Sequence, residues 1–194
     1  YEPIFRAIKT DLLFPPGVNL SKAREKMDLL ENYVLAYGIQ GDKWTRKDRW
    51  IYRRIRGLEF SSSVQTDAEK ETEQLLNDLK AMVVTPLQRL ARRLKRADSG
   101  RKLCEAVYLY IEELNIPTKL EEWRLDAEGK GHLVEAREHD QAWNAVIDLF
   151  DQFVEILGEQ EVTPKQFIAI LDSGFESLKF SLIPPAIDQV VVAN

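Results

Sequence analysis

Residues 29–44 read LLENYVLAYGIQGDKW, and this stretch carries the clearest signals for the fold. Its apolar residues follow the i, i+3, i+4, i+7 spacing of a helix that packs against another element: Leu30, Tyr33, Val34 and Tyr37. Gly38 stands where helices commonly end in a left-handed residue, and Gly41 begins a turn toward Trp44. The stretch therefore predicts the end of a packed helix followed by a short loop.

Helical periodicity recurs along most of the chain. We expect helices at residues 4–13, 21–37, 66–83, 85–96, 103–114, 117–125, 133–157 and 164–178. Ser21 is the expected cap of the second helix, and Thr66 with Glu69 forms a capping box. Thr85-Pro86 is expected to restart or kink a helix, and Thr163-Pro164 to start the last one. The pattern predicts an all-α, bundle-like domain of many helices.

The composition excludes several classes of protein. The 194 residues are 44% hydrophobic and 30% charged, with a net charge of -5, so no global basic field indicates nucleic acid. The single cysteine, Cys104, excludes an internal disulfide. No apolar run approaches the roughly 18 to 20 residues that span a bilayer, so we expect no membrane partner.

The two ends predict a piece of a longer protein. The chain begins YEPIF without an initiator Met and finishes IDQVVVAN, which is typical of a strand without a nearby partner. A lone strand is not stable by itself. We therefore expect a helical domain over residues 1–187 and the start of a strand of another domain at 188–194.

No arrangement of residues predicts a catalytic or metal site. The P-loop, the G-x-S-x-G elbow and the H-E-x-x-H pair are all absent from the sequence. His132 and His139 are separated by about 10 Å of helix rise, too far for one zinc ion. Cys104 lies on an apolar stripe and is expected to be a buried small hydrophobe. The carboxylates, Glu73 among them, are expected on exposed helix faces and in first turns.

Two basic clusters are the candidate binding surfaces. Residues 44–56 contain seven charged residues, six of them basic, and three aromatic ones. Cations for phosphates and flat rings for stacking are the ingredients of a nucleic-acid surface. The candidate contact residues are Trp44, Arg46, Lys47, Arg49, Trp50, Arg53 and Arg54 in this segment, and Arg89, Arg92, Arg93 and Arg96 in the second cluster.

Two questions about these clusters stay open at the level of sequence. The segment 44–56 fits either a helix or a short extended stretch, and the fold of residues 44–63 is not decided. The cations of both clusters fit a DNA surface, a solvated face paired with local acids, or an interface to a larger protein.

Several strings resemble a known family. They are FRAIKTDLL at 5–13, ENYVLAYGI at 31–39, CEAVYLYIEEL at 104–114, EAREH at 135–139 and LIPPAIDQV at 182–190, together with Trp44, Trp50 and Trp143. They are similar to the B subunit of the AddAB-type ATP-dependent helicase–exonucleases of Gram-positive bacteria. The resemblance covers essentially all 194 residues.

The resemblance implies a place and a role. It implies a subunit related to superfamily 1 helicases, without motor activity, that carries a nuclease domain. This chain would be the 2B-like helical insertion, and residues 190–192 the strand that re-enters the second motor-like domain. It also implies a cytoplasmic heterodimer with an A subunit that unwinds and degrades duplex DNA ends in recombinational repair.

The family's cofactor sites have no counterparts here. The resemblance implies ATP, Mg²⁺ and a 4Fe–4S cluster in the longer protein, but this chain has no positions that match those motifs. We therefore expect a non-catalytic subdomain that positions duplex DNA or the partner subunit. The alternative is a purely structural interaction module that makes no contact with DNA.

Overall fold

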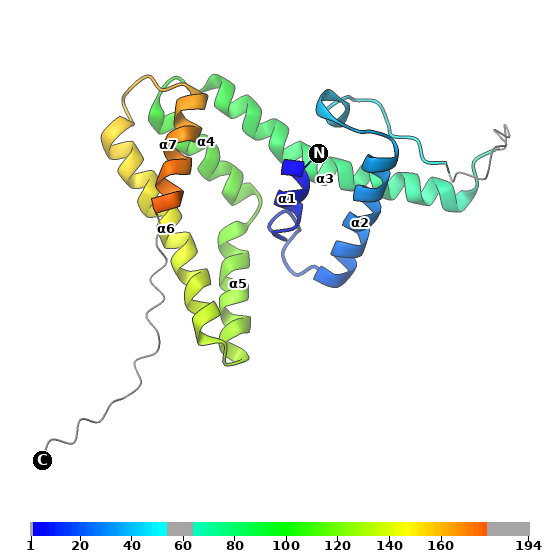
Figure 1. Cartoon of the computed structure of the whole chain (residues 1–194), viewed down its shortest axis with the longest axis horizontal. Helices are drawn as coiled ribbons and strands as arrows, with labels where there is room; N and C mark the ends of the chain where they lie inside the picture. The colour runs from blue at the N-terminus through cyan, green and yellow to red at the C-terminus, as the bar shows by residue number, and fades with distance from the viewer. Residues whose placement is uncertain (1, 54–63, 178–194) are drawn as a thin grey trace, which may run out of the picture. The chain divides into compact units, whose positions relative to one another are not determined.

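The computed structural model describes residues 2–53 and 64–177, and within them all regular structure is helical. The elements are α1 (Glu2–Ile8), α2 (Leu20–Ala36), the 3₁₀ helix η1 (Gly41–Trp44), α3 (Asp67–Arg96), α4 (Gly100–Glu113), α5 (Ile116–Gly129), α6 (Leu133–Leu157) and α7 (Pro164–Ser177) (Figure 1). The all-α class is confirmed. The strand expected at 188–194 lies outside the described residues, so the domain boundary at 187 stays a prediction. No helix in the described ranges has both the length and the apolar character needed to cross a membrane.

The chain divides into two compact units. Unit 1 comprises residues 1–96 and 106–116, and unit 2 comprises residues 97–105 and 117–194. Helix α4 therefore contributes to both units, with its first residues in unit 2 and the rest in unit 1.

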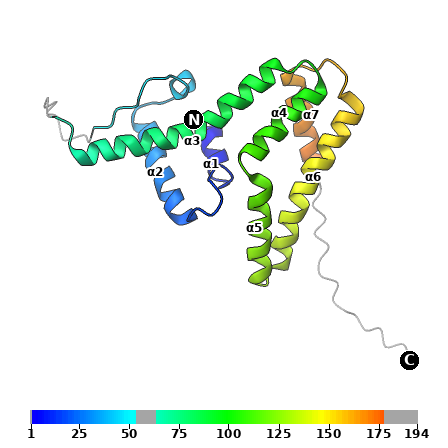
Figure 2. The same ribbon diagram turned by 180° about the vertical axis from the view of Figure 1, so that it is seen from behind.

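Unit 1 is built on the packing of α2 against α3. Helix α2 lies across α3, and the chain that leaves α2 returns along α3 as an irregular segment (Figures 1 and 2). Leu30, Leu76 and Val83 are fully buried at the centre of this core. Each such side chain contributes roughly 1.5–3 kcal/mol on burial, so the apolar stripe of α2 fixes the packing.

The end of α2 follows the sequence prediction, but its start does not. Gly38 has φ 55°, and the N–H of Ile39 donates to the carbonyl of Val34 at 2.9 Å, which is the Schellman arrangement. At the other end Asn19, rather than Ser21, is the cap, because its Oδ1 accepts from the N–H of Lys22 at 3.0 Å. The helix begins two residues earlier than a Ser21 cap would allow.

Helix α1 ends at Ile8, five residues before the expected end. Asp11 has φ 61° and is only 8% exposed, although it follows the apolar stripe of α1 as a charged residue. Both of its carboxylate oxygens accept hydrogen bonds from the guanidinium of Arg24 on α2. This ion pair compensates the buried carboxylate, and the positive φ of Asp11 prevents the chain from resuming the helix.

Helix α3 runs through Pro86 without restarting, so of the two expectations for Thr85-Pro86, a restart or a kink, the restart is wrong. An internal proline removes one hydrogen bond and costs about 3 kcal/mol. Val83 and Val84, in the turn before Pro86, are buried against the core and offset this cost. The capping box at the start of α3 is confirmed, because the Thr66 N–H donates to Glu69 at 2.8 Å and the Glu69 N–H to Thr66 at 3.3 Å.

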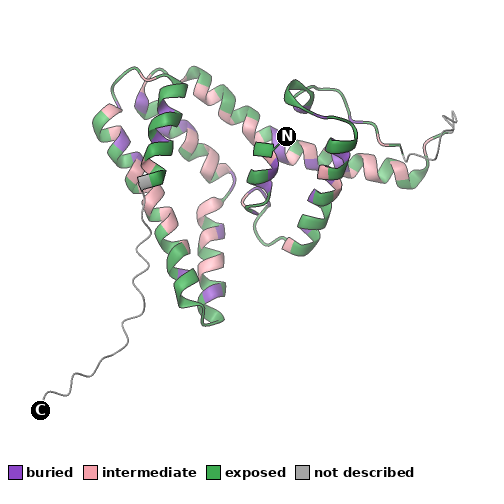
Figure 3. Ribbon diagram, viewed as in Figure 1, coloured by how far each residue is buried: buried purple, intermediate pink, exposed green. Residues whose placement is uncertain are grey.

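Unit 2 is a small group of helices in which α7 packs on α6. Phe153 and Phe167 meet edge to face, with ring centroids 5.0 Å apart. Gly100 approaches the end of α6 closely, because a Cβ there would lie 2.3 Å from the Leu157 carbonyl oxygen. The faces of α6 and α7 turned away from this core are mainly exposed (Figure 3).

Candidate nucleic-acid interface

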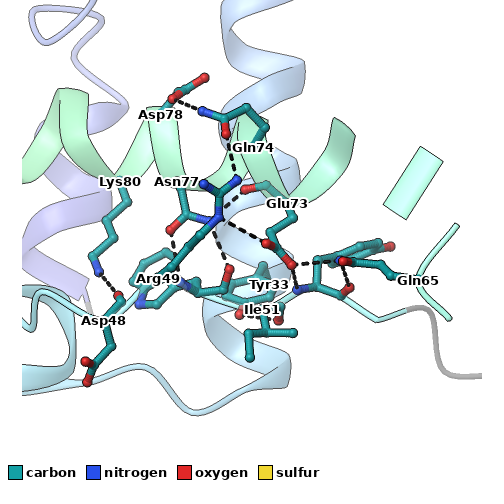
Figure 4. A network of polar contacts seen from close by, with 12 residues as sticks. Tyr33, Asp48, Arg49, Ile51, Gln65, Glu73, Gln74, Asn77, Asp78 and Lys80 are labelled. Atoms are coloured by element: carbon teal, nitrogen blue, oxygen red, sulfur yellow. Dashed lines mark hydrogen bonds and ion pairs between the residues drawn. The ribbon is translucent and has the colours of Figure 1, made fainter. Parts of the chain in front are cut away.

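The segment 45–53 is irregular, and side chains of α3 hold its backbone (Figure 4). Asn77 makes two bonds to Trp50: its Oδ1 accepts from the backbone N–H and its Nδ2 donates to the carbonyl, both at 2.9 Å. Glu73 accepts from the backbone N–H of Tyr52 at 3.1 Å. The amide of Asn77 thus takes the place of a neighbouring strand, and the segment has no regular secondary structure here.

Lys80 holds the first half of the same segment. Its ammonium donates to the backbone carbonyls of Arg46 and Asp48, each at 3.0 Å, and lies 4.8 Å from the centre of the Trp50 ring. Partial burial lowers the pKa of Lys80, and the nearby Asp48 opposes that shift. Lys80 is therefore occupied within the fold and does not add a free cation to the surface.

The two tryptophans of the segment belong to the core. Trp44 is 3% exposed and Trp50 is 7% exposed, and their rings meet edge to face at 5.3 Å. The indole Nε1 of Trp44 is buried and has no hydrogen-bond partner among the described residues. The structure therefore corrects the expectation that these rings stack on DNA bases, because neither presents a face to solvent.

Arg49 is engaged in the network rather than facing a ligand. Its Nε donates to Glu73 at 3.0 Å and its Nη2 to Gln74 at 2.6 Å. Gln65 also donates to Glu73, so this carboxylate receives bonds from three residues and its side chain is only 12% exposed. The hydrogen bonds from Gln65 and from the Tyr52 backbone, with Arg49, hold the pKa of Glu73 below its ordinary value, although burial opposes them. The sequence interpretation of Glu73 as an exposed acid is wrong.

The remaining cations of the segment are exposed. Arg46 makes an ion pair with Asp42 at 2.6 Å on the surface, and their hydrogen bond lowers the pKa of Asp42. Lys47 is exposed and has no ion-pair partner among the described residues. Arg53 is exposed, and its carbonyl accepts from the hydroxyl of Tyr37 at 3.2 Å. Arg54 lies outside the described residues.

The second cluster also separates into engaged and exposed residues. Arg89 and Arg93 both bind Glu113 of α4, Arg93 at 3.1 Å, so they join two elements of unit 1. Burial raises the pKa of Glu113, but the bonds from these two arginines outweigh it and the net shift is downward. Arg92, like Arg96 at the end of α3, is exposed. Only the exposed members can meet an external ligand without breaking the fold.

The structure brings exposed cations of the two clusters onto one face of α3. Asn77, Lys80 and Gln88 contact the segment, the last lying 3.5 Å from the carbonyl of Thr45, and they share one face at i, i+3, i+11 spacing. Arg92 and Lys95 follow Gln88 at i+4 and i+7 and therefore continue that face. We call Arg46, Lys47, Arg92 and Lys95 the cationic row. Arg96 lies outside it.

Sequence reasoning missed the residues that create this row. Glu73, Asn77 and Lys80 are spaced i, i+4, i+7 and form a polar face in the first half of α3, beside an aromatic segment without secondary structure of its own. This combination in the sequence could have identified the residues that hold the segment. It indicates a helix whose polar side chains satisfy the backbone of a neighbouring segment.

Comparison with known proteins gives consistent matches. The chain is 54% identical over all 194 residues to the B subunit of the ATP-dependent helicase/deoxyribonuclease of Geobacillus kaustophilus. It is 50% identical to the B subunit of the Bacillus licheniformis enzyme and 47% identical to that of Bacillus cereus, again over its whole length. These 194 residues are homologous to one segment of the B subunit. The resemblance drawn from the sequence is confirmed.

The homology covers a limited share of these relatives. The chain spans 17% of the length of each of them. No protein-family model matches the chain. The activity in the relatives' names is therefore a property of proteins several times longer than this segment.

Within the described ranges, the chain shows no group of three or more His, Cys, Asp or Glu residues that could hold a metal ion. Glu135 lies between the two histidines, 3.3 Å from Nδ1 of His132 and 3.9 Å from Nε2 of His139. Burial raises the pKa of Cys104 to about 11, so its thiol is protonated at neutral pH and is a poor nucleophile. The cationic row is the strongest candidate site.

Proposed function

We propose that this chain is a non-catalytic helical subdomain of the B subunit of an ATP-dependent helicase/deoxyribonuclease and that its cationic row contacts the backbone of duplex DNA. In this proposal the longer protein processes double-strand ends for recombinational repair in the bacterial cytoplasm, together with an A subunit. ATP, Mg²⁺ and the iron–sulfur cluster would be bound in other parts of that protein.

The observation that supports this proposal is the shared face of α3. The hydrogen bonds from Lys80 hold the carbonyls of residues 46 and 48, so Arg46 and Lys47 lie above the face that Arg92 and Lys95 continue. From Lys80 to Lys95 the helix rises about 22 Å. That is about six phosphate spacings along one DNA strand.

The chemistry of the row suits phosphates rather than bases. Lys47 and Lys95 are flexible point charges, and no aromatic ring or amide of the row is placed to read a base edge. Such contacts position a duplex without selecting its sequence. Since Arg46 is paired with Asp42, a phosphate has to compete for it, and we assign the larger effects to Lys47 and Arg92.

The test is duplex binding by the 194-residue chain as a function of salt. The variant is Lys47→Glu/Arg92→Glu, and the control is Arg137→Glu/Lys165→Glu, which makes the same change in net charge at exposed positions of unit 2. We expect the row variant to reduce the slope of log K against log salt by roughly two, because about 0.9 counterion is released per phosphate contact. The control should keep the slope. Equal slopes for the two variants would contradict the proposal.

A structural module without DNA contact is the second candidate. Exposed apolar side chains on α6 and α7 favour it, since Ile156 is 70% exposed, Ile168 53% and Phe175 41%. Such residues are typical of surfaces that another protein or domain covers. Loss of complex formation by Ile156→Asp/Ile168→Asp, with DNA binding insensitive to the row variant, would establish this alternative.

A further inference from the structure

An aromatic stack in unit 1 runs from the core to the surface. Tyr33 stacks on Trp50, with ring centroids 5.4 Å apart, and on Tyr37, with centroids 4.4 Å apart. Trp50 and Tyr33 are 7% and 6% exposed, but Tyr37 is 40% exposed. The stack therefore ends at the surface with the ring of Tyr37.

Hydrogen bonds fix the tyrosine rings in this stack. The hydroxyl of Tyr33 donates to the carbonyl of Ile51 at 2.8 Å, and that of Tyr37 donates to the carbonyl of Arg53 at 3.2 Å. Burial, aided by the charges of neighbouring groups, raises the pKa of Tyr33 to about 12, so its phenol remains a neutral donor. Because the rings are held at their hydroxyl ends, a ligand that uses a ring face meets a preorganised surface.

An open groove lies beside the stack. It has a volume of about 250 Å³, and Tyr33, Tyr37 and Tyr52 line it together with Asn32 and Arg53. Among the residues that the structure describes, Arg53 is the one charged residue of this lining. The groove is thus mainly aromatic, with the guanidinium of Arg53 in its lining.

We propose that this groove binds an unpaired nucleobase of single-stranded DNA, stacked on the tyrosines with its phosphate near Arg53. Fixed aromatic rings bordered by cations are the combination by which proteins bind single strands without reading their sequence. An apolar side chain of a protein partner would fill the groove, but it would gain nothing from Arg53. The charge on the rim therefore favours a nucleotide.

The groove extends the proposed function, on which this inference rests, to a junction between duplex and single strand. Lys47 of the cationic row and Arg53 of the groove are six residues apart on one segment, so at most about 20 Å of chain separates them. A duplex on the row could thus place the first unpaired base of one strand in the groove.

The test compares two single strands that differ only in their bases. A twelve-residue oligothymidylate and an abasic strand of the same length carry the same phosphates. We expect the unchanged chain to bind the base-containing strand about tenfold more tightly, which is the usual scale of stacking on an aromatic side chain. Tyr37→Ala should reduce this ratio to about one, and Tyr37→Phe should retain it because the ring remains.

The control is Leu35→Ala, which removes an exposed apolar side chain of α2 that does not line the groove. It should keep the tenfold ratio. A ratio of one in the unchanged chain, or a ratio that survives Tyr37→Ala, would overturn the proposal. The binding ratios of the unchanged chain and of Tyr37→Ala do not depend on the cationic row. If the row does not bind duplex DNA, that result appears in the salt slope for duplex binding and not in these ratios.

Discussion

The segment 45–53 and the last turns of α3 carry similar cations, but their backbones are held in different ways. Helix α3 satisfies its own N–H and carbonyl groups, so Arg92 and Lys95 keep their places whatever their neighbours are. The segment has no regular backbone hydrogen bonds of its own, and the side chains of Asn77, Glu73 and Lys80 bond to its backbone instead. The position of its charges therefore depends on a few side chains of another element.

This difference separates the roles of the arginines in the two regions. In the segment, Arg49 closes the network around Glu73, while Lys47 is left exposed. In the helix, Arg89 and Arg93 share Glu113, while Arg92 is left exposed. Each basic cluster thus contains cations that brace the fold and cations that stay exposed, and the sequence alone does not distinguish them.

The largest expected effect is that of Asn77→Ala. This change removes both bonds to the Trp50 backbone and leaves a partly buried N–H and carbonyl without partners, so we expect a loss of about 2 kcal/mol or more in the free energy of unfolding. Urea unfolding followed by tryptophan fluorescence measures it. The matched control is Asn144→Ala on α6, where the exposed amide donates only within its own helix and the loss should be a few tenths of a kcal/mol. Equal losses would remove the contrast between the two regions.

A smaller, pH-dependent effect is expected for Glu73→Gln. Because the pKa of Glu73 is lower in the folded chain than its ordinary value of 4.5, its charge stabilises the fold fully above about that pH. This stabilisation is lost as the pH falls through the lowered folded-state pKa. The unchanged chain should therefore be more stable than Glu73→Gln at pH 7, and the difference should shrink below pH 4.5.

Urea unfolding at several pH values between 7 and 3 measures this difference. Glu71→Gln, at an exposed position two residues away on α3, is the control and should follow the unchanged chain throughout. A gap between the unchanged chain and Glu73→Gln that stays constant down to pH 3 would mean that the Glu73 charge does not hold the segment.

The smallest effect is expected for Arg89→Ala in the helical cluster. Its ion pair with Glu113 is exposed on the arginine side, and Arg93 still binds the same carboxylate at 3.1 Å. Exposed pairs contribute about 0–1 kcal/mol, so we expect a loss of about 0.5 kcal/mol or less by thermal or urea unfolding. A loss as large as that of Asn77→Ala would show that the helical cluster depends on its side chains just as the segment does.

The sequence predicted the helices well where periodicity and caps agree. The end of α2 at Gly38, the Thr66–Glu69 box and the start of α7 at Pro164 all follow from local rules. Pro86 and Asp11 did not follow them, because tertiary packing of Val83 and Val84 and the ion pair with Arg24 override local preference.

The candidate site was less predictable than the fold. Residue type alone was enough to identify both basic clusters. It did not reveal that Trp44 and Trp50 are buried, or that Arg49, Arg89 and Arg93 are bound to acidic side chains of the fold. Both depend on contacts across 20 residues or more of sequence. The shared face of Lys47 and Arg92 likewise exists only once Lys80 and Gln88 have placed the segment on α3.

The most direct test of the account is a double-mutant cycle for duplex binding by Lys47→Glu and Asn77→Ala. If Asn77 acts by holding the segment that positions Lys47 on the cationic row, the cost of Lys47→Glu in binding free energy should be much smaller when Asn77 is already alanine. Circular dichroism at the binding temperature checks that each variant remains folded. We expect a coupling of about 1 kcal/mol or more between the two positions. Additive effects would contradict it, because the segment's cations would then act independently of the helix that holds them.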